Sequence, residues 1–274
     1  MSSIKICKRC LYPENHPFGL TFIGDICSGC YIHEEKYTID WSKRYADLLD
    51  VLKSIKKKNT SYDCIVPITG GGDTYFTIDF VKNKLGLNPL LVHYNLHFNT
   101  PVGIRNISNI ANSFNCDLVS SVPAPSLIKQ ISKTTLKHFG NFYWQAISGY
   151  LTFPVQTAVK YNIPLIIWGV NGWMDQVGMY SHKDSVQMSQ RCREEHGLQG
   201  IKISDILKLN SKLRIEILST IDELNQYLNG NVTTEALSDA LEDCQLALHY
   251  TAYYNITSPI FGENSIVNIF FITN

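Results

Sequence analysis

The chain has 274 residues, 45% of them hydrophobic, which excludes a disordered polymer and allows one large domain with a small appendage. Its 24 lysines and arginines equal its 24 aspartates and glutamates, so it lacks the basic excess of proteins that grip a phosphate backbone, and we predict no nucleic-acid partner. No apolar run approaches the ~20 residues of a membrane span and the first residues carry no secretory signal, so we expect a cytoplasmic protein without membrane contact.

The first predicted unit, residues 1–38, is a cysteine-rich appendage. Two C-x2-C pairs, Cys7 with Cys10 and Cys27 with Cys30, are separated by sixteen residues. Each pair can direct two thiolates at one ion, and two pairs complete a tetrahedral site, so we predict a structural Zn²⁺. About 35 residues cannot bury a core of their own, and a metal would supply the missing folding energy. Two disulfides, four idle thiols and an iron–sulfur cluster are the alternatives.

The remaining chain predicts a connecting helix at 39–60, an α/β domain at 61–205 and a mainly helical region of unclear role at 206–274. In the α/β domain, continuously apolar segments alternate with helical periodicity. This pattern is typical of a Rossmann-like parallel sheet flanked by helices. The expected strands are 63–68, 89–95, 117–122 and 164–170, and the expected helices are 74–86, 102–115, 126–138 and 144–161. In the last region, we expect helices at 219–229 and 233–250 and a strand near 265–273.

A glycine-rich loop, TGGGDT, follows the first of these strands and precedes a helix. Helix N-termini offer unpaired amides and partial positive charge, and glycines let an anion approach the backbone closely. The loop is neither G-x-x-x-x-G-K-[ST] nor G-x-G-x-x-G. It is either a phosphate cradle or a ligand-free turn between strand and helix.

TGGGDT resembles the S-G-G-x-D-[ST] loop of the PP-loop ATP pyrophosphatases, which cleave ATP to AMP and pyrophosphate. Further stretches resemble the N-acetyl sugar amidotransferases of bacterial surface-polysaccharide, O-antigen lipopolysaccharide and pseudaminic-acid-type pathways. The likeness covers about residues 5–204 and lies in CKRCLYP, CSGC, EEKYTIDW, YDCIVPITGGGDT, GLNPLLVHYN, TPVGIRNISNI, IPLIIWGVNGWMDQVGM and REEHGL. The family loop usually has serine at the position of Thr69 and lysine at that of Gly72.

This resemblance implies an enzyme that binds ATP and Mg²⁺ and converts the N-acetyl group of a free or nucleotide-linked sugar to an acetamidino group. ATP would adenylylate the amide oxygen, and ammonia from separate glutaminase and synthase-like subunits would displace AMP. By resemblance, Asp73 is catalytic through magnesium and the pyrophosphate end is held by Thr69, Gly70, Gly71, Gly72 and Thr74. The sequence leaves the sugar and the oligomeric state open. The alternatives are a tRNA-modifying PP-loop enzyme of thiolase or lysidine type and a catalytically impaired nucleotide-binding subunit.

Other candidate residues follow from the expected sheet, since ligands of open parallel sheets bind beyond the carboxyl ends of the strands. This rule brings His93, Asn95 and Gly169 to the edge that carries the glycine loop, as ATP-binding candidates. His93 is equally consistent with a satisfied histidine at the edge of the core. The polar-aromatic segment after Gly169 is either the sugar site or an ordinary solvated loop; its candidates are Asn171, Trp173, Asp175 and Gln176. Asn106 reads as a helix cap or a solvent-facing side chain.

Overall fold

The computed structural model describes residues 4–16, 19–55, 61–169, 181, 183, 197–210 and 268–272. The candidate sugar-site residues and the expected helices 219–229 and 233–250 lie outside these ranges. Within the described part of the chain, no helix combines the length and the hydropathy that a membrane span requires.

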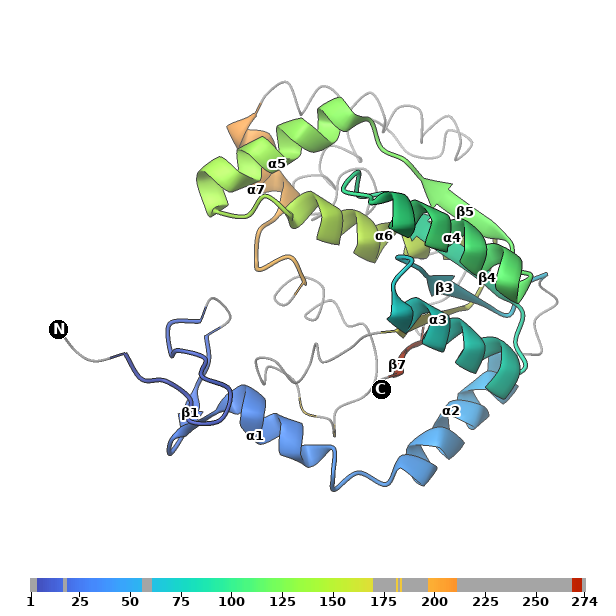
Figure 1. Cartoon of the computed structure of the whole chain (residues 1–274), viewed down its shortest axis with the longest axis horizontal. Helices are drawn as coiled ribbons and strands as arrows, with labels where there is room; N and C mark the ends of the chain where they lie inside the picture. Colours follow the sequence, from blue (N-terminus) through green and yellow to red (C-terminus); the bar gives the residue numbers. More distant parts are fainter. Residues whose placement is uncertain are drawn as a thin grey trace.

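The N-terminal appendage contains a short antiparallel hairpin, β1 (Phe22–Ile23) and β2 (Ile26–Cys27), followed directly by helix α1 (Ser28–Glu35). Its small core consists of the buried residues Cys7, Leu20 and Cys27. The chain then enters helix α2 (Trp41–Ile55), which leads from the appendage to the sheet (Figure 1). Asp40 Oδ1 accepts the amide of Lys43 at 3.0 Å and so caps the start of this helix.

The larger unit is built on a five-stranded sheet in the order β5-β4-β3-β6-β7, in which all neighbouring strands are parallel. The strands are β3 (Cys64–Pro67), β4 (Pro89–Tyr94), β5 (Leu118–Ser121), β6 (Leu165–Gly169) and β7 (Asn268–Ile272). They confirm the expected strands, and β7 shows that a segment near the end of the chain adds to the edge of the sheet. The predicted domain boundaries stay a prediction.

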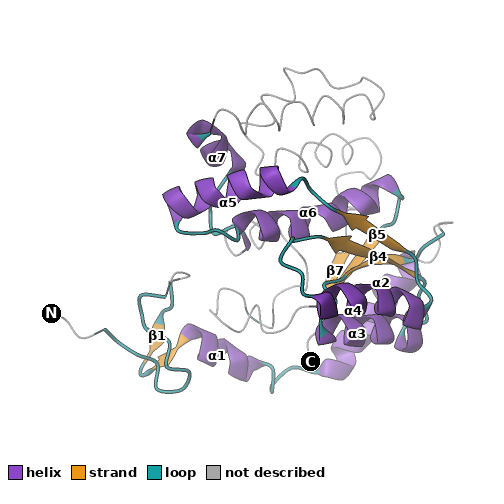
Figure 2. Ribbon diagram, turned by 45° about the horizontal axis from the view of Figure 1, so that its top comes forward, coloured by secondary structure: helices purple, strands orange, loops and turns teal. Residues whose placement is uncertain are grey.

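Helices cover both faces of the sheet (Figures 1 and 2). They are α3 (Gly72–Asp79), α4 (Pro101–Phe114), α5 (Pro125–Phe139), α6 (Trp144–Lys160) and α7 (Ile203–Leu209). Helix α3 continues into a π-helical turn, η1 (Phe80–Lys84). Because side chains alternate along a strand, each strand contributes to two core layers. Val66, Leu91 and Ile167 pack with α2, α3, η1 and α4, whereas Ile65 and Trp168 pack with α6. The two layers confirm the predicted α/β class.

The order of the strands locates a topological switch point. Counted along the chain from β3, the sheet runs third, second, first, fourth, fifth. The chain therefore runs from β3 toward one edge of the sheet through β4 and β5, and then places β6 on the other side of β3. In open α/β sheets, ligands bind beyond the carboxyl ends of the strands at the point where the strand order reverses. The segment that follows β3 at this point is the glycine loop.

Candidate functional site

The glycine loop joins the central strand β3 to the N-terminus of α3. Gly71 is the N-terminal cap of this helix and no side chain caps it. Thr69 and residues 71–73 are exposed, whereas Gly70 and Thr74 are buried. Thr74 Oγ1 accepts the amide of Thr69 at 3.2 Å and lies 3.5 Å from its hydroxyl oxygen, which closes the loop across its base. The loop therefore presents open backbone and one exposed hydroxyl at the positive end of a helix.

Helix α4 packs directly against this loop. Gly70 has a φ of +80°, and a Cβ there would lie 3.0 Å from Ile107 Cγ1 and 3.1 Å from the carbonyl oxygen of Gly103. Both the backbone conformation and the close approach require glycine. Asn106 Nδ2 donates to the Gly70 carbonyl at 3.2 Å. The prediction that Asn106 only caps a helix or faces solvent is therefore wrong: its amide reaches across 36 residues of sequence to the loop.

His93, near the end of β4, contacts Ile68, the residue just before the glycine loop. Its Nδ1 lies 3.1 Å from the carbonyl oxygen of Ile68, and because a carbonyl can only accept, Nδ1 carries the proton. The side chain is buried, at 7% exposure. Burial lowers the pKa of His93 below its ordinary value of 6.5, and the bond to Ile68 offsets part of that effect. His93 is thus a neutral imidazole that ties β4 to the start of the glycine loop.

Asn95 and Gly169 lie at the same edge of the sheet, and each has a structural role there. Asn95 Oδ1 accepts the His97 amide at 2.8 Å and Asn99 Nδ2 at 2.7 Å, so this oxygen orders the segment after β4. A Cβ on Gly169 would lie 2.0 Å from Thr77 Oγ1, because α3 crosses β6 closely. Their assignment to ATP binding stays a prediction. The assignment of Asn171, Trp173, Asp175 and Gln176 to sugar binding also stays a prediction.

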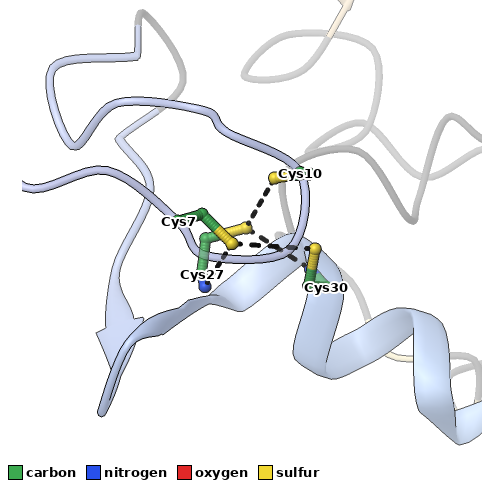
Figure 3. Close-up of side chains that lie close together, drawn as sticks. All are labelled: Cys7, Cys10, Cys27 and Cys30. Carbon is green, nitrogen blue, oxygen red and sulfur yellow. Dashed lines mark hydrogen bonds between the residues drawn. The ribbon is translucent and has the colours of Figure 1, made fainter.

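The four cysteines of the appendage form one cluster (Figure 3). Their sulfur atoms all lie within 4.8 Å of one another. All four thiols are free, with Sγ–Sγ distances of 3.5 Å for Cys10–Cys27 and 3.9 Å for Cys7–Cys30. A disulfide requires about 2.05 Å, so two disulfides do not describe this arrangement. The geometry is that of a four-thiolate metal site, as the spacing predicted.

Backbone amides around the cluster favour ionised sulfur. Cys7 Sγ accepts the amides of Arg9 at 3.4 Å and Cys27 at 3.3 Å, and Cys27 Sγ accepts that of Cys30 at 3.5 Å. Burial raises the pKa of Cys7, but amide donors outweigh it and bring the pKa down to about 6. Burial also raises the pKa of Cys27 and Cys30. Four crowded sulfurs cannot all ionise without a cation between them, so the donor set fits a bound metal.

The two predicted sites belong to different units of the chain. The cysteine cluster lies in the appendage, at the start of α1, and the glycine loop lies at the centre of the sheet (Figure 1). A hydrogen bond joins α1 to a residue that follows β6 in the chain: Ser181 Oγ donates to Glu35 Oε2 at 2.5 Å.

No protein-family model matches the sequence. The chain is 26% identical over 114 residues to the uncharacterized protein MJ1599 of Methanocaldococcus jannaschii, a match that spans 41% of each chain. The chain therefore covers less than half the length of this relative.

Three solved structures resemble parts of the fold. A predicted subunit of a tRNA methyltransferase from Methanocaldococcus jannaschii has 20% identity and a TM-score of 0.31, over 44% of this chain and 58% of that one. An NH3-dependent NAD synthetase from Campylobacter jejuni has 12% identity and a TM-score of 0.38, over 81% and 96%. The U34-tRNA thiolase NcsA of Methanococcus maripaludis, with its 4Fe–4S cluster, has 11% identity and a TM-score of 0.34, over 96% and 92%. These scores are low, and the fold assignment comes from strand order and register.

Proposed function

We propose that this chain is an ATP-dependent enzyme of the PP-loop type that cleaves ATP to AMP and pyrophosphate. The observation that carries the proposal is the position of the glycine loop. It joins the central strand of a parallel sheet to an uncapped helix N-terminus, at the switch point where such sheets bind ligands. The TGGGDT sequence at this position resembles the pyrophosphate loop of that superfamily.

Amides, hydroxyls and one carboxylate of the loop would each make a different contact with a bound pyrophosphate. The exposed backbone of residues 71–73 would donate amides to the phosphate oxygens, and the Thr69 hydroxyl would add a donor from the strand side. Thr74 Oγ1 accepts a bond from the Thr69 amide, and its own hydrogen can be donated either to the phosphate or to the Thr69 hydroxyl 3.5 Å away. Asp73 is exposed in the first turn of α3, where its carboxylate would hold Mg²⁺ against the phosphates.

For the substrate, we propose the N-acetyl group of a sugar, as the sequence resemblance implies. The amide oxygen would attack the α-phosphorus of ATP, and pyrophosphate would leave. Ammonia from a separate glutaminase and synthase-like pair would then attack the activated carbon, and AMP would leave with the former amide oxygen. The product is an acetamidino group. The protein would contribute positioning and charge stabilisation. The proposed sugar contacts are Asn171, Trp173, Asp175 and Gln176.

For the appendage, we propose a structural Zn²⁺ held by Cys7, Cys10, Cys27 and Cys30. All four ligand positions would be protein sulfurs, which leaves no open position for a substrate. An iron–sulfur cluster uses the same donor set, and metal analysis with an absorption spectrum separates the two, since Zn²⁺ sites lack the visible bands of iron–sulfur clusters.

The test follows the fate of ATP. The protein is incubated with Mg²⁺, ATP, ammonium and a panel of free and nucleotide-linked N-acetyl sugars, and AMP, ADP and pyrophosphate are quantified. We expect AMP formation that needs both sugar and ammonium and falls at least about 100-fold in Asp73→Ala. Asp79→Ala is the matched control, because Asp79 is an exposed carboxylate on the same helix.

Other outcomes discriminate between the alternatives. ADP in place of AMP contradicts the PP-loop assignment. AMP that depends on tRNA and not on any sugar keeps the ATP chemistry and replaces the substrate. ATP binding without turnover, after the glutaminase pair has been added, identifies an impaired nucleotide-binding subunit.

A further inference from the structure

The Gly70–Gly71 peptide of the candidate loop has a glycine on each side. Neither residue has a Cβ that would limit rotation of the peptide plane. A peptide between two glycines can turn over with little steric cost, and its N–H and C=O then exchange sides. A loop that must present an amide to an anion therefore needs something to hold this plane.

The described contacts identify what holds it. Asn106 Nδ2 donates to the Gly70 carbonyl oxygen at 3.2 Å from the first half of α4. Helix α4 is itself fixed at this end: Thr100 Oγ1 accepts the Gly103 amide at 3.0 Å, and Ile110 is fully buried in the core. The carbonyl of Gly70 is thus drawn to α4 by an anchored side chain.

The direction of the neighbouring amide follows from peptide geometry. No described peptide bond is cis, and in a trans peptide the C=O and the next N–H point in opposite directions. When Asn106 holds the Gly70 carbonyl on the α4 side, the Gly71 N–H points away from α4. Gly71 and Gly72 are exposed, and α4 packs against Gly70 on the opposite side, so an anion would approach the loop from the side to which this N–H points.

We infer that Asn106 is a positioning residue, which locks the Gly70–Gly71 peptide so that the Gly71 amide faces the pyrophosphate. This inference rests on the proposed function. It adds that the cradle is organised before ligand arrives, by a side chain outside the loop, so binding does not have to stop the peptide from turning.

Two substitutions separate this role from simple packing. Asn106→Ala removes the donor. Asn106→Asp keeps the size of the side chain but places a carboxylate opposite the Gly70 carbonyl, which favours the turned peptide, with the Gly71 N–H directed at the carboxylate. Asn109→Ala is the matched control, since Asn109 is an exposed asparagine on the same helix.

Binding of Mg²⁺–pyrophosphate and of AMP is measured separately by calorimetry for each folded variant. We expect Asn106→Ala to weaken pyrophosphate binding about five- to tenfold, the size of one lost hydrogen bond. Asn106→Asp should weaken it more, Asn109→Ala should leave it unchanged, and AMP binding should stay the same in all three. A merely structural role would weaken both ligands together.

Unchanged pyrophosphate affinity in both Asn106 variants overturns the inference and leaves the proposed function intact. AMP affinity that falls as much as pyrophosphate affinity does the same. Wild-type protein that binds neither ATP nor pyrophosphate rejects the proposed function instead. The peptide lock has its own readout in that case: the ¹⁵N–¹H resonance of Gly71 should shift in ligand-free Asn106→Ala and not in Asn109→Ala. An unshifted resonance overturns the lock itself.

Discussion

The appendage and the α/β unit reach stability by different means. In the α/β unit, two apolar layers enclose the sheet, and strand residues such as Ile65 and Ile167 are fully buried. In the appendage, only a few side chains are buried among the described residues, and two of them, Cys7 and Cys27, are also proposed metal ligands. The same sulfur atoms therefore serve as core and as ligands. One unit should respond to loss of metal and the other to changes in packing.

Replacing one cysteine should give the largest effect. We expect Cys27→Ser to abolish stoichiometric metal binding and unfold the appendage, because structural Zn²⁺ supplies ~10–16 kcal/mol of apparent binding energy to small metal-dependent domains. The α/β unit should stay folded. Elemental analysis checks the metal, and limited proteolysis checks the fold: cleavage should concentrate within residues 1–38. A strong chelator should reproduce the effect in the wild type.

Cys116→Ser is the control, because Cys116 is a free, half-buried cysteine outside the cluster whose Sγ contacts the Phe114 carbonyl at 3.5 Å. It should keep the full metal content. If the appendage of metal-free Cys27→Ser resists proteolysis as well as that of the wild type, the appendage does not depend on metal. Packing alone would then stabilise it, as in the α/β unit.

The converse test changes packing in the α/β unit and leaves the cluster alone. A Cβ at Gly169 would lie 2.0 Å from Thr77 Oγ1, so α3 would have to move away from β6. We expect Gly169→Ala to lower the free energy of unfolding by about 1–3 kcal/mol, the range of overpacked cores, with unchanged metal content. Denaturant unfolding followed by circular dichroism measures this change.

Two further variants show whether the contact with Thr77 is the cause. Gly72→Ala should leave stability nearly unchanged, because no atom lies within 4 Å of a Cβ at that position. Adding Thr77→Ala to Gly169→Ala removes the obstructing hydroxyl and should recover part of the loss. Equal destabilisation by Gly72→Ala and Gly169→Ala would show that the close approach of Thr77 to Gly169 does not cause the loss of stability.

Much of the fold could be predicted because its signals are local. Apolar runs such as 63–68 and 164–170 are too uniform for a solvent-facing strand, and they form the buried centre of the sheet. The cysteine spacing is also local, since each C-x2-C pair fixes two ligands within one turn. Only the meeting of the two pairs had to be inferred from the preferred coordination of a metal.

The contacts that shape the glycine loop could not be predicted, because their partners are distant in sequence. Asn106 reaches Gly70, and His93 reaches Ile68, across 36 and 25 residues. The requirement for glycine at position 169 likewise arises from Thr77, on another element. Periodicity assigns a residue to an element but does not determine which residue of a neighbouring element it contacts. One available signal was that Asn106 lies one turn after Gly103, where α4 can approach another backbone.

The smallest expected effect is pH-dependent and belongs to the α/β unit. Because burial lowers the pKa of His93 in the folded protein, the unfolded chain, with a pKa near 6.5, binds the proton first as the pH falls. Stability should therefore be unaffected by this group above pH 6.5 and should decrease as the pH drops from 6.5 to the lower folded value. His93→Asn removes this contribution, so the stability advantage of the wild type over the variant should shrink on acidification. Denaturant midpoints between pH 8 and pH 5 measure it, and an advantage that grows toward pH 5 would mean that His93 is stabilised as the cation, with its pKa raised by a carboxylate near the glycine loop.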